Sequence, residues 1–523
     1  MKRNNILIVI LFAMLMSFSC TNLNEDFQGD LKASQVKTAT TAQTSALLTG
    51  VYNSTCMYFQ STTSGMCAFN VLTTDELMAP TRGADWDDNG NWRVLHQHKW
   101  DGSHTRIRDL FNNLCGTVFS ATDFLQYGPT AQQEAEARLI RAWGMYWMLD
   151  LFDQVPYREP GESVLQPSKV RKGMEALNYI ISEINTVSAN LPTGPAGLAN
   201  KDAAKVFLMK IYLNKGVYAN RANPTFDVSD MNKVISLADE IISTNKYSFT
   251  SNYFDNFAPN NTAIGKENIW TQENVGGKGS NYKFRYRWNT FMHYNQKPAG
   301  SNGWVLLPEF FNKFEANDKR KGCAYVSAGS PANPGNRINV GFLVGQQYDL
   351  TTDSPLKDRG GNLLIFTPEV KIIETGTNLE VTGIRPIKYP IDFVNDASNL
   401  VDNDYVYFRL SDVLLMKAEA ILRGGTATAS GTFGNTALEL VNSIRTHESR
   451  GASALSSLNL DVLLDERGRE LYQEGWRRQD LIRFGKFLQP WYEKPQSDPK
   501  YLVFPISDQQ LAVNPNLVQN PGY

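Results

Sequence analysis

The stretch Leu464-Asp-Glu-Arg-Gly-Arg-Glu-Leu-Tyr-Gln-Glu-Gly-Trp-Arg-Arg-Gln-Asp-Leu-Ile-Arg-Phe-Gly-Lys486, near the end of the chain, carries the most information about the fold. Leu464 and Leu471 lie at helical spacing and predict an apolar stripe that packs on a core. Gly475 is expected to end this helix, because glycine adopts the left-handed conformation of a helix C-terminus at little cost. Trp476 then begins a second short helix. Taken alone, the stretch predicts a charged helical hairpin packed on a core.

The first residues are typical of a secretory signal. Lys2 and Arg3 precede an apolar run over residues 6–16, which is too short to span a bilayer. Ser17-Phe-Ser19 and then Cys20 follow this run, and Cys20 resembles the cleavage site of a lipoprotein, in which this cysteine is the acylated first residue of the mature chain. We therefore expect a signal peptide at 1–19 and an acylated tether at 20–35. The alternative is an ordinary cleaved signal with Cys20 as an unmodified thiol.

Charge and cysteine content argue against some kinds of binding partner and against a disulfide-rich fold. The 523 residues can bury a large core, and the net charge of −2 with a pI near 6.3 argues against nucleic acid or an anionic membrane as the main partner. Four cysteines follow Cys20, which are too few for a disulfide framework. A bridge between Cys56 and Cys67 would close the shortest loop, and the sequence leaves this pairing open.

Helical periodicity dominates the first half of the chain. Apolar residues recur every three or four positions over residues 135–149, and a second stripe with Trp143 and Trp147 lies beside the first, so both faces are predicted to be buried. Further helices are predicted near residues 172–190, 201–218 and 229–245, separated by turns that contain proline or glycine.

Residues 250–400 have a different character, rich in Asn, Gly, Pro, Tyr and Trp and poor in helical periods. Irregular segments of this kind on a rigid scaffold commonly carry recognition. Helices are predicted to resume over residues 405–420 and 437–445. The expected fold of residues 36–523 is mostly α, with tetratricopeptide-like helical pairs at about 36–249 and 401–523 and a loop-rich insertion at about 250–400.

Aromatic and polar side chains gather between residues 74 and 100 in a pattern that suits a sugar. The C–H faces of sugars pack on aromatic rings, and their hydroxyl groups bind Asp, Asn or Arg. A second such tract lies in the insertion. The candidate glycan-binding residues are Arg82, Asp85, Trp86, Asn89 and Trp92 in the first tract, and Tyr286, Trp288 and Trp304 in the second. The alternative for each tryptophan is burial in the core.

Two other patterns suggest chemistry less strongly. Asp85, Asp87 and Asp88 could bind calcium or serve glycosidic acid catalysis, but carboxylates in such a loop more often form turns or accept hydrogen bonds from sugars. His96 and His98 could lie on one strand face as metal ligands, but a third ligand has no local source. We expect no catalytic group, no metal site and no cofactor.

Five motifs, in order along the chain, resemble the SusD/RagB family of outer-membrane lipoproteins. They lie at residues 141–156, 410–420, 441–445, 467–483 and 514–523. In the first of them Asp153 replaces a glycine of the family pattern. The second reads Leu410-Ser-Asp-Val-Leu-Leu-Met-Lys-Ala-Glu-Ala420, and the last ends in Gln519-Asn-Pro-Gly-Tyr523.

The resemblance implies a SusD-like fold and a function without catalysis. Similar proteins are anchored by lipid to the outer membrane, face the cell exterior, bind a glycan and act as a lid on a SusC-like TonB-dependent transporter that imports it. The absence of a dense basic cluster favours a neutral glycan. Two alternatives remain: a secreted glycoside hydrolase with paired carboxylates such as Asp75 and Asp85, or a scaffold that binds only proteins on its helical face.

Overall fold

The computed structural model describes residues 40–63, 65–279 and 284–523. The predicted signal peptide, the tether and Cys20 lie outside these residues. Within them, no helix combines the length and the apolar character needed to cross a membrane. Cys56, Cys67, Cys115 and Cys323 are all free thiols, so Cys56 and Cys67 are not bridged.

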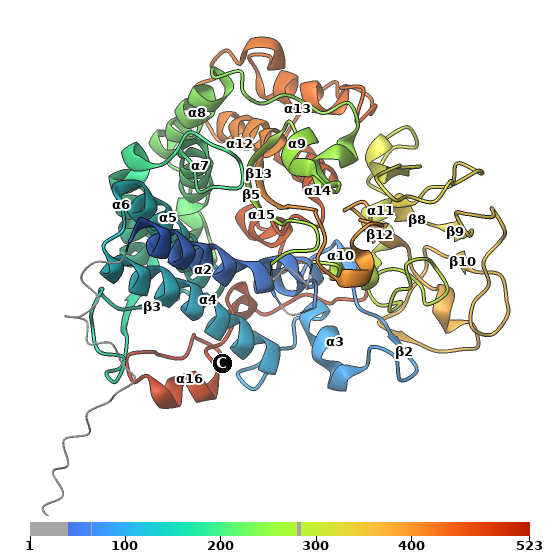
Figure 1. The fold of residues 1–523 in the computed structure, drawn as a ribbon, viewed down its shortest axis with the longest axis horizontal. Helices are drawn as coiled ribbons and strands as arrows, with labels where there is room; N and C mark the ends of the chain where they lie inside the picture. Colours follow the sequence, from blue (N-terminus) through green and yellow to red (C-terminus); the bar gives the residue numbers. More distant parts are fainter. Residues whose placement is uncertain (1–39, 64, 280–283) are drawn as a thin grey trace, which may run out of the picture.

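A stack of antiparallel helices forms the larger part of the molecule (Figure 1). Each long helix of the first half packs on the next long helix along the chain, and the last of them packs on α12. The helices are α2 (Thr41–Gln60), α4 (Thr105–Phe124), α5 (Ala131–Phe152), α6 (Gly173–Val187), α7 (Lys201–Ala219), α8 (Val228–Ile242) and α12 (Leu410–Leu422). The mostly α fold and the three helices predicted over 172–245 are confirmed.

Helix α5 lies at the centre of this stack. Its N-terminus is a capping box, in which the Thr130 hydroxyl accepts from the N–H of Gln133 and the Gln133 side chain accepts from the N–H of Thr130. Both faces are buried, and Trp143 contacts eight other aromatic rings. The helix ends at Asp153, whose φ of 57° explains why the family pattern has glycine there.

The segment between α8 and α12 contains short strands, turns and long loops, and much of it forms a lobe at one side of the molecule (Figure 1). One sheet of this lobe has the order β12 (Arg385–Ile387), β8 (Val340–Leu343), β7 (Gly322–Cys323). A separate antiparallel pair joins β5 (Asn268–Gln272) to β13 (Tyr405–Arg409). The predicted helix over 405–420 is therefore wrong at its start. Residues 405–409 are aromatic and β-branched and pair with β5, and the helix begins at Leu410.

The C-terminal motif lies in the core. Helices α14 (Leu460–Leu471) and α15 (Arg477–Arg483) carry arginines and carboxylates that are buried. Arg469 binds Glu466 of its own helix, and the other four arginines of the motif bind a carboxylate on another element: Arg467 with Asp480, Arg477 with Asp75, Arg478 with Asp150 and Arg483 with Glu419. The predicted hairpin is present, but its charged side chains bind inside the molecule and do not form a solvated face.

A second group of buried charges surrounds Glu470. We call it the buried ion cluster, and its members are Glu267, Arg320, Arg409, Arg450, Glu466 and Glu470, whose side chains have no exposed surface. They come from α14, β13, the lobe and the loops before β5 and α14. Charges taken out of water are stable only when they are paired, so the cluster fixes how these elements meet.

Glu76 is a buried carboxyl beside this region, and it provides a test by pH. Burial raises its pKa to about 8. Since the folded-state pKa lies above the unfolded one, Glu76 contributes stability at low pH that is lost as pH rises towards 8. We expect Glu76→Gln to gain stability relative to the wild type between pH 5 and pH 8, by at most about 1.4 kcal/mol per pH unit. Urea unfolding of the variant and the wild type at pH 5, 6.5 and 8 measures this difference, and Glu448→Gln, at an exposed position, is the control. A stability difference between Glu76→Gln and the wild type that stays the same at all three pH values would contradict the prediction.

Candidate functional site

Trp86 lies in a tight turn at the edge of the lobe. The turn follows β2 (Thr81–Arg82), and the main chains of Arg82 and Asp85 exchange hydrogen bonds of 2.9 and 3.1 Å. The indole N–H of Trp86 donates to the Ser301 carbonyl at 2.8 Å, and its ring covers Gly303. A Cβ at Gly303 would lie 2.3 Å from the indole, so only glycine fits there. The half-buried ring is therefore held in one position with part of its surface open.

The other predicted tryptophans are core residues. Trp92 and Trp304 pack below Trp86, with ring centroids 6.3 and 6.5 Å from its ring, and both are buried. Trp288 is also fully buried, and its indole N–H donates to Asp396 at 2.8 Å. A ring without exposed surface offers no face to a sugar. The prediction that Trp92, Trp288 and Trp304 contact glycan is therefore wrong.

Arg82 is a structural residue as well. Its guanidinium group donates to the carbonyls of Asn302, Gly303 and Thr382 at 2.7, 2.9 and 2.7 Å, and burial lowers its pKa to about 10. Because its donors are directed at main-chain carbonyls inside the protein, the predicted sugar contact of Arg82 is wrong. The side chain instead holds the loop that supports Trp86.

A polar edge lies beside Trp86. The Asp85 carboxylate accepts from the Tyr294 hydroxyl at 2.9 Å and from Arg359 at 3.1 Å, and the Arg359 guanidinium lies 4.0 Å from the centre of the Tyr294 ring. The side chains of Asp85 and Arg359 are 43% and 51% exposed. Burial and the Asp85 hydrogen bond raise the pKa of Tyr294 to about 12. We call Asp85, Trp86, Asn89, Tyr294 and Arg359 the Trp86 surface.

Glu380 fixes Arg359 in this position. It binds Arg359 and also His293, at 2.9 Å. Burial opposes the ionisation of Glu380, but its hydrogen bonds with Arg359 and His293 outweigh this and lower its pKa. Burial lowers the pKa of His293, so this imidazole is neutral near pH 7 and donates to Glu380 through Nε2, since Nδ1 accepts from Asn295. The polar edge is thus ordered before any ligand binds.

The three aspartates of the turn have separate partners. Asp87 binds Arg93, Asp88 accepts from the Trp92 indole, and Asp85 binds Tyr294 and Arg359. Asn89 follows the three aspartates in the chain, with φ 54° and an exposed position. The aspartates therefore act as turn-forming and positioning groups.

The remaining predicted residues lie elsewhere. His96 ends helix α3 (Asn91–His96), so the pair is not on a strand. His96 binds the Tyr492 carbonyl, and His98 binds the Thr73 carbonyl and Ser497. Both oxygens of Asp75 accept from Arg477 at 2.7 Å. Tyr286 is half-buried at the start of α10 (Tyr286–Asn289), and its contact with glycan stays a prediction.

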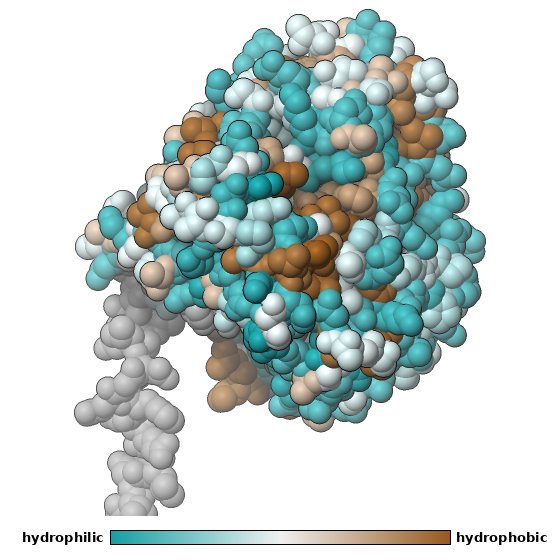
Figure 2. Space-filling view, turned by 90° about the vertical axis from the view of Figure 1, so that its right-hand side faces the viewer, coloured by the Kyte–Doolittle hydropathy of each residue, from teal (hydrophilic) through white to brown (hydrophobic). Residues whose placement is uncertain are grey.

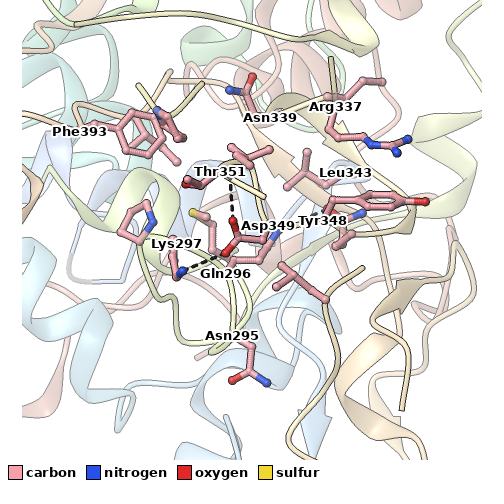
Figure 3. A pocket seen from close by; sticks show the side chains of 18 of the residues that line it. Asn295, Gln296, Lys297, Arg337, Asn339, Leu343, Tyr348, Asp349, Thr351 and Phe393 are labelled. Carbon is pink, nitrogen blue, oxygen red and sulfur yellow. Dashed lines mark hydrogen bonds and ion pairs between the residues drawn. The ribbon is translucent and has the colours of Figure 1, made fainter. Parts of the chain in front are cut away.

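A cavity of about 630 Å³ lies in the lobe (Figure 3). Asn295, which lines it, directly follows Tyr294 of the Trp86 surface. We call it the lobe cavity. Residues 292–298 form one wall, and most of the remainder comes from residues 329–351 and 391–397. Sequence reasoning did not find Tyr294, Arg359 or this cavity. Tyr294 and Arg359 are 209 and 274 residues from Asp85, and no local pattern links them.

Comparison with known proteins gives a consistent result. Residues 266–523 match the SusD family. The chain is 25% identical over 493 residues to the starch-binding protein SusD of Bacteroides thetaiotaomicron, covering 87% of this chain and 84% of that protein. A solved laminarin-binding SusD-like protein has a TM-score of 0.66 at 18% identity, covering 93% of this chain and 100% of its own. The surface glycan-binding protein A of B. thetaiotaomicron, solved with laminarihexaose, has a TM-score of 0.66 at 16% identity. This match covers 92% of the present chain and 100% of that protein.

The solved structures confirm the SusD-like fold, and the family match agrees with the motifs at residues 410–523. These relatives are named for binding and not for catalysis, in agreement with the prediction that the chain is not an enzyme. On these grounds residues 266–523 belong to the SusD family, and the chain has the SusD-like fold.

Proposed function

We propose that this protein is a cell-surface lipoprotein that captures an oligosaccharide at the Trp86 surface and delivers it to a SusC-like TonB-dependent transporter, on which it acts as a lid. The observation that carries the proposal is the fixed, partly exposed Trp86 ring beside Asp85 and Arg359. The names of the relatives support it, because they specify starch and laminarin, both of them glucans.

The chemistry of the Trp86 surface suits a neutral sugar. The indole supplies an apolar face for C–H groups, Asp85 accepts from hydroxyls, Arg359 donates to them, and Asn89 can do both. Arg359 is shared by the carboxylates of Asp85 and Glu380, so no unpaired cation remains to select an anionic ligand. Since the ring and the ion pair are already held in place, binding costs little side-chain entropy.

Titration calorimetry of residues 21–523 against plant, microbial and host polysaccharides tests the proposal, with release of reducing sugar monitored in the same samples. We expect binding without release, with dissociation constants on the order of micromolar to millimolar. Release of reducing sugar would support the alternative that the chain is a glycoside hydrolase. Binding to none of them would favour a scaffold that contacts only proteins.

The lipid anchor is tested at Cys20. We expect Cys20→Ser to remain unacylated and to leave the membrane fraction, because each buried methylene of an acyl chain contributes about 0.8 kcal/mol to anchoring. Mass spectrometry of the mature N-terminus and fractionation of cells measure these outcomes. A wild-type chain that begins at another residue without acylation would contradict the proposal.

The transporter partner is tested separately. A tagged full-length chain, purified from detergent-solubilised outer membranes, should bring down a TonB-dependent transporter in stoichiometric amount. We propose that the helical stack contacts the transporter, as tetratricopeptide-like stacks bind proteins, whereas glycan binds the Trp86 surface. Trp86→Ala should therefore leave this complex intact. Loss of the transporter complex in a folded Trp86→Ala variant would contradict the assignment of glycan and transporter to separate surfaces.

A further inference from the structure

We propose that the lobe cavity is a second binding site for sugar, which takes an uncharged unit of the same glycan that binds the Trp86 surface. The inference rests on the proposed function and extends it to a site built from other residues. The lobe cavity has a volume of about 630 Å³, which lies within the range of small-molecule sites, and its lining combines apolar and polar side chains.

One part of the cavity is apolar and open to solvent. Ile338 and Val344 line it and are 51% and 40% exposed, and the rings of Phe342 and Phe393 lie among them. Figure 2 shows apolar surface within a hydrophilic surround on the face that carries the lobe. Apolar side chains that border a cavity together with polar ones are the usual composition of a small-molecule site.

Tyr348 supplies an ordered aromatic ring. The Arg337 guanidinium lies 3.6 Å from the ring centre and binds Asp353 at 2.8 Å, which fixes the plane of the ring. Figure 3 shows Tyr348 at the edge of the cavity below Arg337. Within the described part of the chain, no side chain or main-chain group pairs with the Tyr348 hydroxyl. Since Arg337 covers one face of the ring, the opposite face and the hydroxyl group are what Tyr348 offers to a ligand.

Asp349 supplies an ionised acceptor. The Lys297 ammonium at 2.9 Å, together with the N–H groups of Thr351 and Thr352, lowers the pKa of Asp349 to about 2. Figure 3 shows Lys297 and Thr351 bound to this carboxylate. It is thus charged at all physiological pH values and accepts from hydroxyl groups without changing its protonation.

The charges of the lining balance. Lys297 and Arg337 are cationic, Asp349 and Asp396 are anionic, and each belongs to an ion pair. A carboxylated or sulfated sugar would find no unpaired cation here, whereas an uncharged pyranose needs none. An apolar side chain of another protein suits the cavity less well, because it would cover the Asp349 carboxylate without binding it.

Two short segments connect the cavity to the Trp86 surface. Tyr294 belongs to that surface, and Lys297, three residues later, lines the cavity. Likewise, Leu356 lines the cavity and Arg359 binds Asp85. Three residues span at most about 11 Å, so both sites lie within reach of one short oligosaccharide.

Saturation-transfer NMR tests the inference on residues 21–523 carrying Trp86→Ala, so that the Trp86 surface is disabled. The probes are six uncharged disaccharides, namely maltose, laminaribiose, cellobiose, lactose, mannobiose and xylobiose, with a glucuronic acid disaccharide for comparison. We expect saturation transfer to at least one uncharged probe. It should disappear when Tyr348→Ala or Thr351→Trp is added, since the first removes the ring and the second fills the cavity.

Controls separate a lost site from a lost fold. Val326 is exposed and does not line the cavity, so Val326→Trp should retain the signal, and thermal melting should show all variants folded. No transfer to any uncharged disaccharide, transfer that survives both cavity variants, or stronger transfer to the uronic acid probe would each overturn the inference. These results leave the proposed function standing, because polysaccharide binding by the wild type is measured independently.

Discussion

Glu470→Ala is expected to lower the free energy of unfolding by about 3–5 kcal/mol, the usual cost of removing one partner from a buried ion pair. The Glu470 carboxylate binds Arg409 and Arg450, each at 2.6 Å, and Arg320 at 2.9 Å. Burial opposes its ionisation, but the three guanidinium groups outweigh burial and hold the pKa of Glu470 well below its usual range. The substitution would leave these cations in the core with too few carboxylates.

Urea unfolding followed by circular dichroism measures this effect. The matched control is Glu448→Ala, an exposed glutamate in the same part of the chain, which should change the unfolding free energy by less than about 0.5 kcal/mol. Equal effects of the two substitutions would mean that the buried ion cluster contributes no more than a surface charge.

The second large effect is expected at Trp86. Trp86→Ala should weaken binding of whichever glycan the wild type binds by at least tenfold, or about 1.4 kcal/mol, because the alanine offers no apolar face to the sugar. Calorimetric titration of wild type and variant with the same glycan measures the change. Thermal melting of both shows whether the fold survives, since Trp86 also packs on Trp92 and Trp304.

Two further variants distinguish the effect of the aromatic ring on affinity from the effect of its position. Trp86→Phe keeps an aromatic face and should retain part of the affinity. Gly303→Ala keeps the indole but places a Cβ 2.3 Å from it, so the ring must move and affinity should fall. A folded Trp86→Ala variant with unchanged affinity would remove Trp86 from the site.

The helices could be predicted because their signals are local. Apolar residues three and four positions apart lie on one helix face, and capping residues mark the ends, so the predicted segments near 172–190 and 201–218 agree with α6 and α7. The same reasoning failed at residues 405–409. Their conformation depends on pairing with β5, which lies more than 130 residues earlier.

The candidate site was predicted only in part. Residue type and spacing pointed to Asp85, Trp86 and Asn89, but the same signal also selected Arg82, Trp92, Trp288 and Trp304, which are buried. An exposed tryptophan and a core tryptophan look alike in a sequence. What distinguishes them is whether other segments cover the ring, as Trp304 lies under Trp86.

The sequence by itself determined the helical scaffold, the family motifs and the neutral balance of charge, because periodicity, capping and composition act over a few residues or over the whole chain. Tertiary structure alone decided that the charged C-terminal motif is buried, that Tyr294 and Arg359 join Asp85, and that a cavity lies in the lobe. The reason is physical: an ion pair or a cavity wall depends on distance in space, and chain segments from tens to hundreds of residues apart supply its two sides.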